Sequence, residues 1–388
     1  MGRLITSSSV PAVVTAVISL LVGPFAAQTA LTRFVEVATS AQGFGEPRRS
    51  SVERSRAEVS GKGAQAPTAA GAAKQSPAKT TAEKTWKTPR TPWGDPDLQG
   101  IWNNATATPL ERPARFGEKP VLTDEEAAEF QEEVASNLTR DRRDGGQEVD
   151  VDRAYNDHWM DARRLQTLQD KRSSLIVDPP GGRLPPSAKL TPERQKAAQE
   201  RAAQVRPFYV DMPRGPEDLA LVTRCILREG HDRVPYLGSI YNNTNQIFQS
   251  PGYVVILSEM VHHARVIPLS GRPHVGPNLR QWLGDTRGRW EGETLVLETT
   301  NFRRDPGLLF GNANPDTFRI VERFTRLGPD ALKYEFTISD PDTWATPWKA
   351  MVSWIRIEEQ LFEYTCHEDN YDMAHFLAST RGREARRP

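Results

Sequence analysis

The sequence has few of the features that identify most enzymes and most metal-binding proteins. Its 388 residues include only 2 cysteines and 7 histidines, and 50 basic side chains balance 50 acidic ones. It contains no His-Glu-x-x-His or Cys-x-x-Cys pattern, no Gly-x-Ser-x-Gly elbow, no phosphate-binding loop and no dinucleotide fingerprint. No motif therefore implies a cofactor. Whether a metal binds is unknown from the motifs, because histidines from distant positions could still assemble a metal site.

The distribution of charge argues against a nucleic-acid partner. Residues 91–388 carry 38 basic and 45 acidic side chains, whereas residues 46–90 carry 10 basic and 4 acidic ones. A nucleic-acid-binding domain usually has an excess of positive charge on its folded part. With 37% hydrophobic residues, the chain is instead typical of a protein with one large or two small folded domains.

The first 90 residues are expected to precede the folded domain. A basic start at Arg3, an uncharged stretch over 10–22 and small residues up to Ala27 are typical of a signal peptide, which we place at residues 1–27. The alternative is an uncleaved anchor, although the stretch is short for a permanent membrane span. Residues 28–90 are rich in Ala, Pro and Lys, which predicts a disordered tether. We therefore expect an exported protein, periplasmic or extracellular, whose basic tether could contact the envelope surface.

The two cysteines, Cys225 and Cys366, are compatible with one disulfide in an oxidising compartment. Such a bond would close a loop of 141 residues and would stabilise the fold by about 4 to 5 kcal/mol in the chain-entropy model. Two separate buried thiols are an equally good interpretation. A catalytic thiol is the least favoured, because a reactive cysteine outside the cytosol is readily oxidised.

The body of the chain is predicted to be mainly antiparallel β. Apolar residues alternate with polar ones from Leu332 to Ile338, which indicates a strand with one buried face. Similar short segments, separated by turn residues, lie at 100–102, 173–178, 246–249, 253–258, 294–302, 318–325, 350–357 and 361–366. Consecutive short strands favour a meander that closes into a lipocalin-like β-barrel of roughly eight to ten strands. A two-sheet β-sandwich is the alternative.

Two peripheral helices complete the expected domain. Thr123 and Glu126 form a capping-box pattern at the start of one helix, and Thr191 followed by Pro192 begins the other. We therefore expect a β-barrel domain over residues 91–375 with a helical insertion at 122–205. Residues 376–388 are expected to form a disordered basic tail.

Several blocks of the chain are similar to an uncharacterised family of exported bacterial proteins that is common in soil acidobacteria. The blocks are Thr91–Trp102, Ser174–Pro180, Ser250–Ile256, Trp282–Asp285 and Arg289–Leu295. The resemblance covers most of residues 91–375 and implies export, but it brings no activity and no catalytic residues.

A weaker resemblance is to lipocalin-like barrels, whose first strand often carries Gly-x-Trp. Here that motif is Gly100-Ile101-Trp102. The resemblance implies a barrel with the tryptophan at its closed end. The long insertion between Trp102 and Gln246 departs from a simple lipocalin.

Two polar segments are candidates for acid-base chemistry. The first contains Glu259, His262, His263 and Arg265, which combine a carboxylate, imidazoles and a guanidinium. A Glu-Arg pair with a purely structural role is the slightly favoured interpretation of this segment. The second segment, His367-Glu368, follows the last predicted strand, where a polar turn is the simpler interpretation.

Aromatic and amide side chains are candidates for ligand contact by stacking and hydrogen bonding. They are Tyr155, Trp159, Tyr241, Asn243, Trp344 and Trp348. Core packing uses such residues just as often.

Three functional hypotheses follow from these patterns. The first is an exported protein that binds a small apolar or aromatic ligand in a β-barrel cavity. The second is an extracytoplasmic hydrolase or lyase in which the two polar segments converge. The third is an envelope interaction module that acts through the tether and the charged helices.

Overall fold

The computed structural model describes residues 86–138, 170–205, 212–228, 234–239, 241–368 and 370–386. The expected signal peptide and nearly all of the expected tether lie outside this part of the chain, as do Tyr155 and Trp159. No helix in the described ranges is long and apolar enough to cross a membrane.

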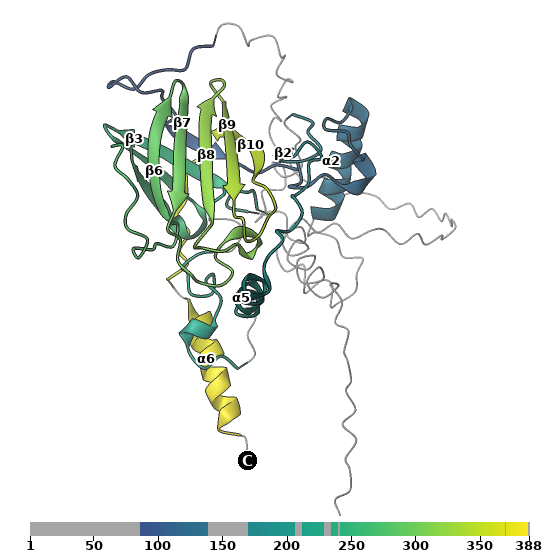
Figure 1. Ribbon diagram of the computed structural model, residues 1–388. Helices are drawn as coiled ribbons and strands as arrows, with labels where there is room; N and C mark the ends of the chain where they lie inside the picture. Colours follow the sequence, from purple (N-terminus) through teal and green to yellow (C-terminus); the bar gives the residue numbers. More distant parts are fainter. Residues whose placement is uncertain are drawn as a thin grey trace, which may run out of the picture.

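A ten-stranded antiparallel sheet dominates the described residues (Figure 1). Its strands are β1 Gly100–Asn103, β2 Ile176–Asp178, β3 Thr244–Ser250, β4 Tyr253–Ser258, β5 Ala264–Pro268, β6 Asp285–Glu291, β7 Thr294–Thr300, β8 Arg319–Arg326, β9 Ala331–Ser339 and β10 Trp348–Ile357. The predicted mainly β class with few helices is therefore confirmed.

The strands follow one another around the sheet in chain order. Their spatial order is β5-β4-β3-β1-β10-β9-β8-β7-β6, and β2 pairs with β10 beside this path. Because β1 pairs with both β3 and β10, the first and last strands of the meander are neighbours. The sheet has its two edges at β5 and β6, which are consecutive in the chain.

No backbone hydrogen bonds join β5 to β6 among the described residues, so the barrel is not closed by a continuous ladder. We refer to this junction between β5 and β6 as the seam. Side chains meet across it: a Cβ atom built on Gly288 would lie 2.5 Å from Cδ2 of Leu269 and 3.0 Å from Cγ2 of Ile267. Glycine at 288 thus allows the two edges to approach closely.

One predicted strand is wrong. Residues 361–366 form no strand, although their sequence alternates. Both edges of β10, the strand that precedes them, are already paired with β1 and β9, so the chain finds no free edge there. The segment instead leads to the disulfide at Cys366.

Three helices and four short 3-10 turns lie around the sheet in the described ranges. The helices are α2 Asp124–Leu138, α5 Pro192–Ala203 and α6 Tyr371–Glu384, and the turns are η1 Ala114–Phe116, η3 Pro216–Asp218, η4 Met260–His262 and η5 Phe310–Asn312. The capping box of α2 is confirmed, since the Thr123 amide donates to Glu126 and the Glu126 amide donates to Thr123 Oγ1. Thr191 caps α5 through its side chain.

Helix α6 corrects the expectation of a disordered tail over residues 376–388. It extends away from the end of the sheet (Figure 1) and continues to Glu384. Asn370, directly before it, donates to the carbonyl of Thr223 at 2.9 Å, and Thr380 is buried. The disulfide at Cys366 and these contacts attach a segment whose charge alone suggested disorder.

Aromatic side chains fill the inner face of the sheet. Eight of them are at most 2% exposed: Trp102, Tyr236, Phe302, Phe324, Tyr334, Phe336, Trp348 and Trp354. At one end, Trp102 Nε1 donates to the carbonyl of Leu98 at 3.0 Å, and the guanidinium of Arg326 lies 5.7 Å from the Trp102 ring. The apolar positions of the alternating strands therefore form a single core.

Candidate functional site

A buried ion pair lies inside the sheet. Arg265 on β5 and Glu322 on β8 approach through two contacts, Nη2 to Oε2 at 2.7 Å and Nη1 to Oε1 at 3.1 Å. Their side chains are 4% and 0% exposed. A carboxylate and a guanidinium that face each other in this bidentate way form a strong, geometrically specific pair. Arg265 therefore pairs with Glu322, and the interior holds one of the predicted site residues.

Four hydroxyl groups surround this pair. Thr286 and Thr299 accept from Arg265 Nη2 at 3.1 and 3.2 Å, and the Tyr236 hydroxyl accepts from Nη1 at 3.2 Å. Tyr334 donates to Glu322 Oε1 at 2.9 Å. We refer to these six residues as the interior polar cluster. Its members come from β5, β6, β7, β8 and β9 and from the loop before β3, so it links five strands of the sheet.

The buried environment changes the acid-base properties of the cluster. Burial lowers the pKa of Arg265, but the charge of Glu322 opposes this effect and the pKa is raised overall, so the guanidinium remains protonated. Burial, with the nearby carboxylate of Glu322, raises the pKa of Tyr334 well above its ordinary value. Burial also raises the pKa of Tyr236. Within the cluster the guanidinium is therefore protonated, and the two phenols keep their protons.

Some buried donors in the core have no acceptor among the described residues. Arg265 Nε, Trp354 Nε1 and Trp348 Nε1 are buried and make no hydrogen bond within the described part of the chain. Two of these side chains contact the same ring: the Arg265 guanidinium lies 5.4 Å from the centre of the Tyr236 ring, and the Trp354 and Tyr236 ring centres are 5.4 Å apart. Unpaired buried donors of this kind indicate an acceptor from outside the chain, either water or a ligand.

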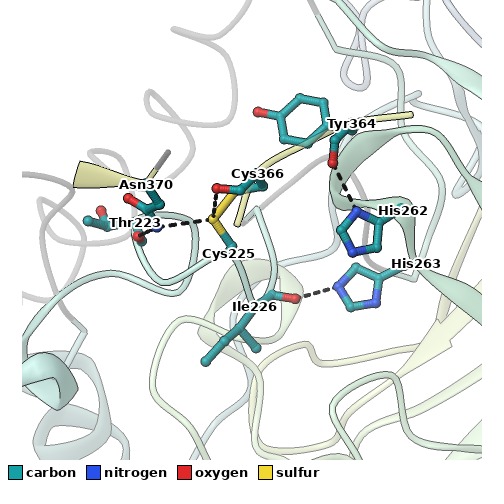
Figure 2. Close-up of a disulfide and its surroundings, with 8 residues drawn as sticks. All are labelled: Thr223, Cys225, Ile226, His262, His263, Tyr364, Cys366 and Asn370. Atoms are coloured by element: carbon teal, nitrogen blue, oxygen red, sulfur yellow. Dashed lines mark hydrogen bonds between the residues drawn. A yellow bond between two sulfur atoms is a disulfide. The ribbon is translucent and has the colours of Figure 1, made fainter. Parts of the chain in front are cut away.

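The disulfide brings the two predicted polar segments together. Cys225 and Cys366 are bonded, with their Cα atoms 5.6 Å apart (Figure 2). His262 is the last residue of η4. Its Nδ1 lies 2.9 Å from the carbonyl oxygen of Tyr364. The ring centres of His262 and His367 are 5.9 Å apart. The predicted disulfide is thus confirmed, and two candidate histidines from distant segments are neighbours.

The other acid-base candidates have surroundings that differ from those of this histidine pair. His263 points to the carbonyl of Ile226, to which its Nε2 donates, and burial lowers its pKa (Figure 2). Glu368 is exposed and Glu259 is half-buried at the start of η4. Arg265 lies in the interior polar cluster, because β5 begins at Ala264 and alternation turns Arg265 inward.

The predicted ligand-contact residues within the described ranges make different kinds of contact. Trp344 and Trp348 are buried, with ring centres 5.7 Å apart, and belong to the aromatic core. Tyr241 lies under the guanidinium of Arg228 at 4.5 Å. Asn243 is buried and donates to the carbonyl of Ser239 at 2.8 Å, which stabilises the turn before β3.

Glu322, Tyr236 and Tyr334 were not among the sequence candidates. Glu322 does carry a recognisable signal, because it occupies an inward position between Ile320 and Phe324 on a strand that otherwise alternates apolar and polar residues. A charged residue on an apolar face predicts a buried partner. The two tyrosines carry no such signal, since each fits an ordinary core position.

Within the described ranges no group of three or more His, Cys, Asp or Glu side chains is arranged to hold a metal ion. Comparison with known proteins finds no matching family model, no matching curated protein and no matching solved structure.

Proposed function

We propose that the protein is an exported binding protein that holds a small ligand inside its β-barrel. The ligand would have an apolar or aromatic body and at least one hydrogen-bond acceptor. It would lie beside the ring of Tyr236, between the unpaired donors of Arg265 and Trp354. Small-molecule binding is favoured over a nucleic-acid partner by the net negative charge of residues 91–388.

The unpaired donors are the observation that carries this proposal. A buried N–H group without an acceptor costs about 1 to 3 kcal/mol, and Arg265 Nε and Trp354 Nε1 would each incur that cost in an empty protein. Carbonyl or carboxylate oxygens of a ligand that accept from these donors would remove the penalties. The surrounding rings of Tyr334 and Phe324, each 0% exposed, supply an apolar surface for the rest of the molecule.

The dense interior limits the size of the ligand and its route of access. Because the aromatic side chains are almost fully buried, only a small molecule fits without displacing them. The seam is the proposed route, since among the described residues side-chain contacts such as Arg265 with Thr286, and no backbone hydrogen bonds, join β5 to β6. Export is supported by the disulfide, which is typical of oxidising compartments.

Native mass spectrometry of the exported protein tests this proposal. The proposal predicts an excess over the sequence mass that disappears when the protein is denatured. Trp354→Phe removes one unpaired donor and should reduce the occupied fraction. Trp344→Phe, a matched substitution of a buried tryptophan whose indole nitrogen is not one of the buried unpaired donors, should retain it. A bare mass for the wild-type protein, or equal occupancy in the two variants, contradicts the proposal.

The hydrolase or lyase alternative has one supporting observation, the proximity of His262 and His367. The guanidinium that would stabilise an anion beside them, Arg265, is instead committed to Glu322 in the interior. Binding is therefore the better-supported proposal. Contact of the basic tether with the envelope stays a prediction from the sequence.

A further inference from the structure

The exposed histidine pair beside the disulfide forms a second candidate site, separate from the barrel interior. His262 lies at the end of η4 and His367 directly follows Cys366, and both side chains are exposed. Their ring centres are 5.9 Å apart and their planes are inclined by 51°. The two rings are therefore neighbours that do not stack flat on each other.

This spacing is close to the one that a shared metal ion requires. Two imidazoles on one cation, with metal–nitrogen bonds of about 2.0 to 2.1 Å, have ring centres roughly 5 to 5.5 Å apart. The observed separation of the ring centres is slightly larger than this range. Because both side chains are exposed, small rotations about their bonds can bring the rings to the required distance. Imidazole nitrogen suits zinc, copper and nickel ions.

The hydrogen bond of His262 leaves the correct nitrogen available. A carbonyl oxygen only accepts, so the 2.9 Å contact with Tyr364 requires the proton of His262 to be on Nδ1 (Figure 2). The lone pair then lies on Nε2. A backbone carbonyl that binds one ring nitrogen while the other faces a metal is a common outer contact of metal-binding histidines.

The disulfide fixes both halves of this arrangement. Tyr364, which orients His262, and His367 stand on either side of Cys366, and residues 361–368 belong to no strand. The bond to Cys225 and the contact of Asn370 Nδ2 with the Thr223 carbonyl, at 2.9 Å, hold this segment against the end of the barrel. Without the bond, the local concentration of His367 at His262 would fall.

We infer that His262 and His367 together bind a divalent transition-metal ion of the copper or zinc class, and that the Cys225–Cys366 disulfide holds the two imidazoles at chelating distance. Water completes the coordination, because no third His, Cys, Asp or Glu ligand is arranged with them in the described ranges. The site is independent of the proposed interior ligand, since neither histidine belongs to the interior polar cluster.

Electron paramagnetic resonance of the oxidised protein with one equivalent of Cu²⁺ tests the pair. We expect a single species with hyperfine coupling to two imidazole nitrogens. His262→Gln or His367→Gln should each remove one coupling and weaken binding at least about 10-fold. His375→Gln changes an exposed histidine of α6 that stacks on Tyr371 and should leave spectrum and affinity unchanged. Equal effects of all three substitutions, or two-nitrogen coupling that survives loss of either histidine, would overturn the inference.

The double variant Cys225→Ser/Cys366→Ser tests the role of the disulfide. We expect Cu²⁺ binding to weaken about 10-fold or more while circular dichroism shows that the sheet remains folded. If this variant does not fold, Asn370→Ala keeps the disulfide and removes one attachment of the same segment, and it should weaken binding by a smaller factor. Unchanged affinity in a folded Cys225→Ser/Cys366→Ser protein would contradict the chelating role of the bond.

Discussion

Arg265 and Glu322 form an ion pair between β5 and β8, two strands that are not neighbours, and the pair crosses the seam on the buried face of the sheet. Between them, Thr286 on β6 and Thr299 on β7 accept from the same guanidinium nitrogen. One side chain of the edge strand β5 thus contacts the three strands beyond the seam. We infer that these side-chain hydrogen bonds take the place of the missing backbone ladder.

Removal of one charge from this pair should be strongly destabilising. Arg265→Met leaves the Glu322 carboxylate buried and unpaired, which costs about 3 to 5 kcal/mol. The double variant Arg265→Met/Glu322→Leu should lose less, because it leaves no uncompensated charge. Guanidinium chloride unfolding of both proteins measures the difference. A double variant that is less stable than Arg265→Met would show that the charges do not act as a pair.

The buried tyrosines should make the protein sensitive to alkali. The pKa of Tyr334 is raised in the folded protein above its ordinary value of 10.0, so the unfolded chain loses this proton first as the pH rises. The contribution to stability is complete below pH 10.0 and decreases above it. The free energy of unfolding of Tyr334→Phe should therefore fall less steeply above this pH. Parallel slopes for the two proteins would exclude the effect.

The close approach at the seam depends on the glycine at 288. In Gly288→Ala the new methyl group meets Leu269 and Ile267 at 2.5 and 3.0 Å, and such overpacking costs about 1 to 3 kcal/mol. Hydrogen exchange should increase along β5 and β6. Gly276→Ala, where an added Cβ has no neighbour within 4 Å, is the control. Equal exchange in both variants would show that the seam tolerates the extra volume.

Loss of the disulfide should destabilise the protein as a whole. The bond closes a loop of 141 residues, for which the chain-entropy model gives about 4 to 5 kcal/mol. Thermal unfolding with and without reductant measures this contribution. A change confined to proteolysis of α6, with no change in the main transition, would show that the bond attaches the terminal helix without stabilising the sheet.

The sequence was informative where the structure depends on local pattern. The alternation from Leu332 to Ile338 predicted β9, and Thr123 with Glu126 predicted the start of α2. Strand β6 was missed because it contains few apolar residues and has Gly288 at an inward position. The alternating segment 361–366 misled because pairing depends on a free neighbouring edge, which local pattern does not reveal.

The candidate sites were predictable only as separate parts. His262 and His367 were both candidates, but the disulfide, which was one of three interpretations of the cysteines, is what brings them together. Arg265 was expected beside Glu259 or the histidines, and it instead pairs with Glu322, 57 residues further along the chain. That pairing follows from the curvature of the whole sheet around its interior.

Electron density beside Trp354 Nε1 and Arg265 Nε, in a crystal of the exported protein, is the most direct test of the proposed binding function. The account predicts continuous density larger than a water molecule, next to the ring of Tyr236 and within hydrogen-bond distance of both donors. Isolated spherical density that refines as water at each donor would contradict it, because the two unpaired groups would then be explained by solvent alone.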